Sequence, residues 1–142
     1  MNNLNKKKKI SFDMDGTLDD HFDGGLNINK IGVQNLLIKL SSDDLFDVYV
    51  ITRRYGPDCL EKGAKNEHLK VFQLLNKLNI ELPKENVLFT NREYKYLLID
   101  KLEIDIHLDD DVKEHELIKK FTNRSSVNIT LPNWENKFDE LL

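Results

Sequence analysis

The sequence predicts a single α/β domain in which helices cover both faces of a five-stranded parallel sheet, a three-layer arrangement. Short apolar runs of strand length alternate along the chain with amphipathic segments of helical period. Strands separated by helical crossovers pair in parallel, because each crossover must pass over a face of the sheet. The length of 142 residues fits one domain, 1–142, and neither an internal repeat nor a Pro/Gly-rich linker divides it.

The first half of the chain is expected to form strands over 9–14, 47–52 and 86–90, with a helix in each interval. The first strand ends at an Asp-Gly turn signal. The run 47–52 is apolar or β-branched at nearly every position, which is typical of a strand covered on both faces. Apolar residues recur at i, i+3, i+4 and i+7 over 33–40, and a second helical face spans 71–78.

The second half continues the alternation. A helix is expected around 94–102, a strand over 104–108, a helix around 117–121, a strand over 127–130 and a short terminal helix that docks through its aromatic side chains, Trp134 and Phe138. This order is that of a Rossmann-like domain, in which ligands bind beyond the carboxyl ends of the strands. The residues that follow each strand are therefore the candidate site.

Composition excludes several classes of protein. The 21 Lys and Arg against 25 Asp and Glu give a net charge of −4, which argues against a generally basic nucleic-acid binder. No apolar run approaches the ~20 residues of a membrane span, and the basic segment 1–8 reads as a flexible leader without the apolar region of a secretory signal. A single cysteine, Cys59, excludes an intrachain disulfide and favours a reducing, cytoplasmic location.

Polar and charged residues collect after four of the strands. They are Asp13 and Asp15, then Thr52, Arg53 and Arg54, then Arg92 and Lys95, and finally Asp109, Asp110 and Asp111. Carboxylates that converge in a crevice repel one another unless a cation compensates them. Oxygen ligands without a nearby cysteine or paired histidines favour Mg²⁺ over zinc. Together with a hydroxyl donor and a lysine, they indicate a phosphoryl-transfer site.

Three of these segments carry a resemblance to a known family. Residues 12–18, Phe-Asp-Met-Asp-Gly-Thr-Leu, resemble the first motif of the haloacid dehalogenase superfamily, most of whose members are phosphatases. Residues 48–52 are similar to its second motif, which ends in Thr or Ser, and 104–110 resemble the fourth, an apolar strand that ends in paired acids. The resemblance extends from about residue 9 to 111.

The resemblance implies a role for each matching residue. Asp13 would attack phosphorus and form an aspartyl-phosphate. Asp15 would protonate the leaving oxygen and then deprotonate the water that hydrolyses the intermediate. Thr52 would hydrogen-bond the phosphoryl group. Mg²⁺ would be held by the Asp13 carboxylate, the Asp15 carbonyl and one of Asp109 or Asp110.

The lysine and arginine assignments leave alternatives open. Lys95 is preferred as the motif lysine because it follows the third strand closely, whereas Lys101 falls late in the same helix. Arg53, Arg54 and Arg92 flank the crevice, where they either grip a substrate phosphate or carboxylate or remain solvated loop charges.

The sequence around the acidic run 109–111 and around the histidines predicts their roles. The apolar alternation that ends at Leu108 favours Asp109 and Asp110 as the motif pair, with Asp111 as a helix N-cap. His107 lies within a core strand and is expected to be a buried structural histidine. The other histidines show no metal-ligand spacing and are expected at the surface: His21, His68 and His115.

The spacing between motifs limits the size of any cap. Only about 30 residues separate Leu18 from Val48, which leaves room for a flap over 18–27 but not for a cap domain. The short cap and the arginine-aromatic rim are similar to the 5′(3′)-deoxyribonucleotidase branch of the family, so the expected substrate is a small phosphorylated molecule such as a (deoxy)nucleoside monophosphate. The alternatives are a polynucleotide 3′-phosphatase and a non-catalytic binding module that keeps the fold.

Overall fold

The computed structural model describes residues 6–19, 30–59 and 66–142. Residues 1–5 of the expected leader and 20–27 of the expected flap lie outside this part of the chain. The elements, in chain order, are β1 (Lys8–Phe12), α1 (Lys30–Ser41), β2 (Phe46–Thr52), α2 (Leu69–Lys77), a 3₁₀ turn (Lys84–Asn86), β3 (Val87–Phe89), α3 (Tyr96–Lys101), β4 (Ile106–Asp109), α4 (Val112–Phe121), β5 (Ser125–Asn128) and α5 (Trp134–Leu141).

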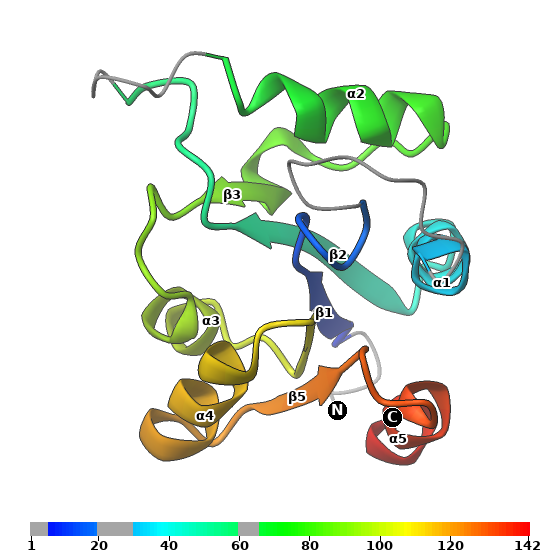
Figure 1. Ribbon diagram of the computed structural model, residues 1–142. Coiled ribbons are helices and arrows are strands. Elements are labelled where there is room, and N and C mark those ends of the chain that lie inside the picture. Colours follow the sequence, from blue (N-terminus) through cyan, green and yellow to red (C-terminus); the bar gives the residue numbers. More distant parts are fainter. Residues whose placement is uncertain (1–5, 20–29, 60–65) are drawn as a thin grey trace.

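The five strands form one parallel sheet in the order β3-β2-β1-β4-β5, as the sequence predicts (Figure 1). The last strand begins and ends earlier than the expected 127–130. Its end follows from local chemistry, because the Asn128 side chain accepts hydrogen bonds from the backbone N–H and the hydroxyl of Thr130 and so turns the chain out of the ladder.

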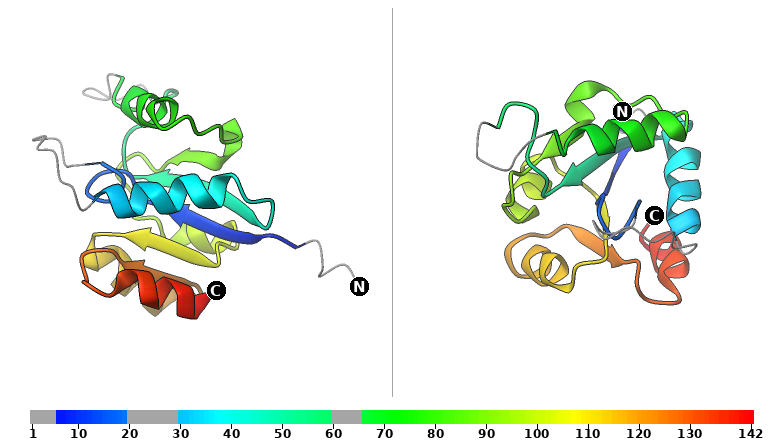
Figure 2. Two further views of the ribbon diagram at one scale, coloured as in Figure 1. Left: turned by 90° about the vertical axis from the view of Figure 1, so that its right-hand side faces the viewer. Right: turned by 45° about the horizontal axis from the view of Figure 1, so that its top comes forward.

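Helices cover both faces of the sheet, which makes three layers (Figures 1 and 2). Since side chains alternate along a strand, the even-numbered residues of β1, β2 and β4, such as Phe12, pack with α1, α2 and α5. Odd-numbered residues of β2, Tyr49 and Ile51, pack on the opposite face with Ile99 of α3 and Ile118 of α4. The odd face of the neighbouring strands, β1 and β4, carries the polar residues described below.

The chain order creates a crevice between β1 and β4. From β1 the chain builds β2 and β3 on one side, and it then returns to place β4 and β5 on the other side. Neighbouring connections therefore leave in opposite directions at the carboxyl ends of β1 and β4, where open α/β sheets bind ligands. The register is level there, because the N–H of Asp13 donates to the carbonyl of Leu108 at 2.9 Å.

The segment after β1 is a compact turn. Gly16 has φ of 81°, a conformation that glycine adopts without the strain of a β-carbon. Its N–H donates to the Asp19 carbonyl at 2.7 Å, and the N–H of Leu18 donates to the Met14 carbonyl at 3.0 Å. Leu18, the expected first residue of the flap, is instead fully buried in the core, because this turn directs its side chain inward.

Within the three described ranges, no helix combines the length and the apolar character that crossing a bilayer requires.

We expect Phe138→Ala to lower the free energy of unfolding by about 3 kcal/mol, because its side chain is 2% exposed and anchors α5 to the sheet. Urea unfolding followed by circular dichroism measures this change. Glu140→Ala, at an exposed position on the same helix, is the matched control and should stay within about 0.5 kcal/mol of the wild type. Equal stability of the two variants would contradict the docking of α5 through Phe138.

Candidate active site

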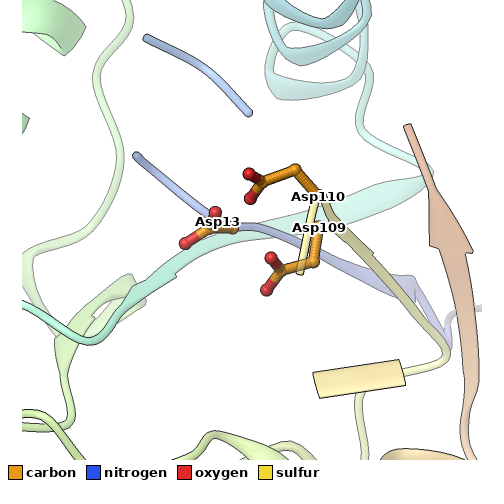
Figure 3. Close-up of side chains that lie close together, drawn as sticks. All are labelled: Asp13, Asp109 and Asp110. Atoms are coloured by element: carbon orange, nitrogen blue, oxygen red, sulfur yellow. The ribbon is translucent and has the colours of Figure 1, made fainter. Parts of the chain in front are cut away.

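Three carboxylates meet at the carboxyl ends of β1 and β4. One oxygen from each of Asp13, Asp109 and Asp110 lies within 4.8 Å of the other two (Figure 3). They open into a cavity of about 660 Å³. All the residues expected at the site line this cavity: Asp13, Asp15, Thr52, Arg53, Arg54, Arg92, Lys95, Asp109 and Asp110, with Asp111 and Val112 beside them.

The pleat of the two strands brings the polar side chains to one face. Ser11 pairs with His107 across β1 and β4, and Asp13 and Asp109 follow two residues further along each strand. Because the period of a strand is two residues, these side chains share the face that α3 and α4 cover. The acidic pair therefore lies directly beyond a buried serine-histidine pair.

Lys95 connects the two strands electrostatically. Its Nζ lies 2.6 Å from Asp13 Oδ1 and 2.6 Å from Asp109 Oδ2, and the residue is 1% exposed. Burial disfavours the ammonium ion, but the charges of Asp13, Asp109 and Glu114 outweigh it and raise the pKa of Lys95. Lys95 stands at the N-cap of α3, whereas the alternative, Lys101, is exposed in the last turn.

The pKa values of the two bridged carboxyls move in opposite directions. Burial, and next the charge of Asp109, raise the pKa of Asp13 well above its usual value of 3.8 in spite of Lys95. Burial also acts on Asp109, but Lys95 and the hydrogen bond from His107 outweigh it and lower the pKa of Asp109. Lys95 favours the ionised form of both carboxyls, but burial dominates at Asp13.

This donor set fits a divalent cation. The formal charges of the three carboxylates and Lys95 sum to −3 + 1 = −2. All three carboxylates supply hard oxygen ligands, which Mg²⁺ prefers in proteins. A cation of charge +2 among them would offset the repulsion from Asp109, which adds to burial in raising the pKa of Asp13.

Two histidines contact Asp109. His107, fully buried as expected, places Nε2 2.8 Å from Asp109 Oδ2 and Nδ1 2.7 Å from Ser11 Oγ. Burial lowers the pKa of His107, so the ring is neutral. An ionised carboxylate only accepts, so Nε2 carries the proton and Ser11 donates to Nδ1.

His115 repeats this arrangement on the backbone of Asp109. Its Nε2 lies 2.9 Å from the Asp109 carbonyl oxygen and its Nδ1 2.7 Å from Ser126 Oγ. His115 was expected at the surface and is instead half-buried, because α4 packs over β5. His68 is also half-buried, with its ring edge-to-face against Phe72, and His21 lies outside the described residues.

Asp110 and Asp111 have different positions in the structure, as the sequence predicts. Asp111 is the N-cap of α4, and its carboxylate accepts from the N–H of Lys113 at 2.9 Å. Asp110 joins Asp109 and Asp13 in the acidic group. The hydroxyl of Thr17, within the first motif, lies 3.0 Å from Asp13 Oδ2 and 3.4 Å from Asp110 Oδ1.

Arg54 and Asp15 form a close ion pair. Arg54 Nε and Nη2 donate to the two oxygens of Asp15 at 2.8 and 2.6 Å, and Nη1 donates to the Glu67 carbonyl. Arg54 is 3% exposed, so its fork holds Asp15 in one orientation. In this arrangement, Arg54 contacts Asp15 where a substrate contact was predicted. Thr52, 1% exposed at the end of β2, accepts from the Arg54 N–H.

The other two arginines form the rim of the cavity. Arg92 pairs with both carboxylate oxygens of Glu67 and lies 4.3 Å from the ring centre of Tyr55. Arg53 lies 4.3 Å from the ring centre of Tyr94, and its long ion pair with Asp111 measures 3.9 Å. Arg53 also donates from Nη2 to the Arg92 carbonyl at 2.8 Å, so the two arginines are joined at the rim.

Sequence reasoning missed two carboxylates that support the site. Glu114 is fully buried, accepts from the Lys95 N–H at 3.0 Å and approaches Lys95 Nζ at 3.8 Å. Its spacing of four residues from Ile118 places it on the apolar stripe of α4, a pattern from which its burial follows. Glu67 accepts from Arg92 and from the Tyr55 N–H, and no local pattern marks it.

No protein-family model matches the chain, and the curated proteins include no detectable relative. The function must therefore be argued from the site itself. Its parts are a group of three carboxylates that could hold a cation, a buried ammonium ion, a strand-end hydroxyl and a further carboxylate held by an arginine. Such a set can bind a dianionic phosphoryl group next to a nucleophile and a proton donor.

The Glu67–Arg92 ion pair should make part of the free energy of unfolding depend on pH. Burial acts against ionisation of Glu67, but hydrogen bonds from Arg92 and Tyr55 lower its pKa below the usual 4.5. The stabilisation is therefore complete well above pH 4.5 and is lost as the pH falls through the lowered pKa. We expect Glu67→Gln to be less stable than the wild type by about 1 kcal/mol at pH 7 and by less at pH 3.

Urea unfolding at both pH values measures the difference. Glu140→Gln, at an exposed position, is the control for a general effect of removing a carboxylate. A stability gap between wild type and Glu67→Gln that stays constant from pH 7 to pH 3 would contradict the assignment.

Proposed function

We propose that the protein is a Mg²⁺-dependent phosphomonoester hydrolase that acts through an aspartyl-phosphate on Asp13. The observation that carries the proposal is the contact of Lys95 with two carboxylates. Its Nζ lies 2.6 Å from an oxygen of Asp13 and 2.6 Å from an oxygen of Asp109, and Asp110 lies beside them. This geometry agrees with the roles implied by the resemblance to the haloacid dehalogenase superfamily. The cytoplasmic location expected from the single cysteine is part of the proposal.

The chain's own residues supply the chemistry. Thr52 and Lys95 donate hydrogen bonds to the phosphoryl oxygens, and an Asp13 carboxylate oxygen attacks phosphorus. Asp15 gives a proton to the leaving oxygen as the phosphorus–oxygen bond breaks. Asp15 then takes a proton from the water that attacks the aspartyl-phosphate, which releases inorganic phosphate and restores the Asp13 carboxylate.

The Arg54 fork orients Asp15, and one of its two hydrogen bonds must open for Asp15 to carry the proton. It fixes the Asp15 carboxylate at the mouth of the cavity, where the leaving group of the substrate would lie. The Asp15 side chain is 18% exposed, whereas that of Asp13 is 8% exposed, so solvent reaches Asp15 more readily. This division suits a nucleophile enclosed beside the acidic group and an acid that meets the leaving group.

The metal would be held by the carboxylates of Asp13, Asp109 and Asp110 and the carbonyl of Asp15. Mg²⁺ would supply charge compensation for the nucleophile and for the transferred group. The chain positions these ligands through Thr17, which contacts Asp13 and Asp110, and through Lys95, which contacts Asp13 and Asp109.

The proposed substrate is a (deoxy)nucleoside monophosphate. A cavity of about 660 Å³ is of the size that small ligands occupy, and Arg53, backed by Tyr94, presents a planar cation at its rim. A guanidinium plane can stack on a nucleobase, since both are flat and conjugated. The net charge of −4 disfavours binding of a long polynucleotide, so the polynucleotide 3′-phosphatase is the second candidate and not the first.

Asp13→Asn is expected to lower the rate of Mg²⁺-dependent p-nitrophenyl phosphate hydrolysis by at least about 1000-fold, because an amide cannot attack phosphorus. Phosphate release with malachite green measures it, and EDTA should abolish the wild-type rate until Mg²⁺ is restored. Asp44→Asn, an exposed aspartate in the loop before β2, is the matched control and should keep the wild-type rate. Equal rates for wild type and Asp13→Asn would remove the nucleophile, and no hydrolysis by the wild type would favour the non-catalytic binding module.

A substrate panel tests the proposed substrate class. We expect kcat/KM to be highest for nucleoside and deoxynucleoside 5′-monophosphates, lower for sugar phosphates, and lowest for an oligonucleotide with a 3′-phosphate. Arg53→Gln should raise KM for the nucleotides and leave p-nitrophenyl phosphate hydrolysis nearly unchanged if the rim reads the nucleobase. Preference for the oligonucleotide end would replace the nucleotidase with the polynucleotide 3′-phosphatase.

A further inference from the structure

Asp109 has its two carboxylate oxygens in different surroundings. Oδ2 accepts from Lys95 Nζ at 2.6 Å and from His107 Nε2 at 2.8 Å, which uses both of its lone pairs. Oδ1 accepts from the Asp111 N–H at 3.0 Å and keeps one lone pair. A cation can therefore meet Asp109 through Oδ1, while Oδ2 already carries two donors.

The donors on Asp109 differ in rigidity. Lys95 reaches the site on a flexible four-carbon chain, so it can follow either oxygen when the carboxylate rotates. The His107 ring projects from β4 and is locked by Ser11, its partner across the strand pair. The N–H of Asp111 belongs to the backbone. One anchored donor on each oxygen therefore prevents the carboxylate from rotating.

We propose that Ser11 and His107 form a positioning pair that keeps Asp109 a one-oxygen ligand and so makes the site select Mg²⁺ over Ca²⁺. Mg²⁺ is small, requires six ligands in near-octahedral order and accepts single carboxylate oxygens. Ca²⁺ takes six to eight ligands and often both oxygens of one carboxylate. A carboxylate whose second oxygen is held by an imidazole N–H and an ammonium ion cannot offer both. The inference rests on the metal site of the proposed function.

His115 and Ser126 provide an internal control. They form the same serine-histidine unit, with Nε2 on Asp109, but the acceptor is the backbone carbonyl. Removing His115 should therefore remove a histidine contact from Asp109 without releasing a carboxylate oxygen. Only the His107 unit is expected to affect the choice between the two cations.

The experiment is calorimetric titration of the full chain with Mg²⁺ alone and with Ca²⁺ alone, in the absence of substrate. In the wild type, the dissociation constant for Ca²⁺ should exceed that for Mg²⁺. We expect His107→Leu to lower the ratio of these constants by about tenfold, the equivalent of one hydrogen bond to a charged group. His107→Gln, whose amide can still donate to Oδ2, should restore the ratio to within about twofold of the wild type. His115→Leu should leave it unchanged.

Ser11→Ala tests the same unit if the buried leucine variant fails to fold. It keeps the imidazole but removes the donor that holds it, so the ratio should fall by about threefold. If folded His107→Leu keeps the wild-type ratio of the Ca²⁺ and Mg²⁺ dissociation constants, the inference is overturned and the metal site is unaffected. If His107→Leu does not fold, a wild-type ratio in Ser11→Ala has the same meaning. An equal fall in His115→Leu would also overturn the inference. If the wild type binds neither cation, the metal site is overturned and the proposed function with it. If the dissociation constants show the expected ratios but the protein has no phosphatase activity, the inference is supported and the phosphatase is contradicted.

Discussion

The buried ammonium ion of Lys95 is the interaction on which the site depends. Two carboxylates from different strands approach it at 2.6 Å in a region that water barely reaches. Without the lysine, Asp13 and Asp109 would face each other as uncompensated buried charges, which is strongly destabilising. Glu114 reinforces the arrangement, because it accepts from the Lys95 N–H and places a third carboxylate 3.8 Å from the ammonium nitrogen.

The topology of the sheet explains why the acids meet between β1 and β4. At this pair of neighbouring strands the connections diverge, toward β2 from β1 and toward β5 from β4, which opens a crevice at the carboxyl ends. The level register then sets Asp13 beside Asp109, and the strand period sets both above Ser11 and His107. The acidic pair, Asp13 and Asp109, is thus next to the Ser11–His107 pair on the same face of the two strands.

The three arginines at the edge illustrate how similar residues acquire different roles. Arg54 is buried against Asp15, Arg92 is paired with Glu67, and Arg53 is stacked on Tyr94 with a long ion pair to Asp111. The loops after β2 and β3 bond to each other, since the N–H of Arg92 donates to the Arg53 carbonyl at 2.7 Å. The rim is consequently one connected structure.

The sequence by itself determined the alternation of strands and helices, the parallel sheet and the set of strand-end residues that line the cavity, because periodicity and turn chemistry are local properties. It also predicted Asp111 as a cap and His107 as a buried histidine. The sequence favoured Lys95 over Lys101, but only the tertiary structure placed its Nζ between Asp13 and Asp109. Only the tertiary structure paired Arg54 with Asp15, partly covered His115 and brought Glu114 to the site. Lys95 and Asp13 are 82 residues apart, and the contact between them depends on the path of whole loops and helices, which no local pattern encodes.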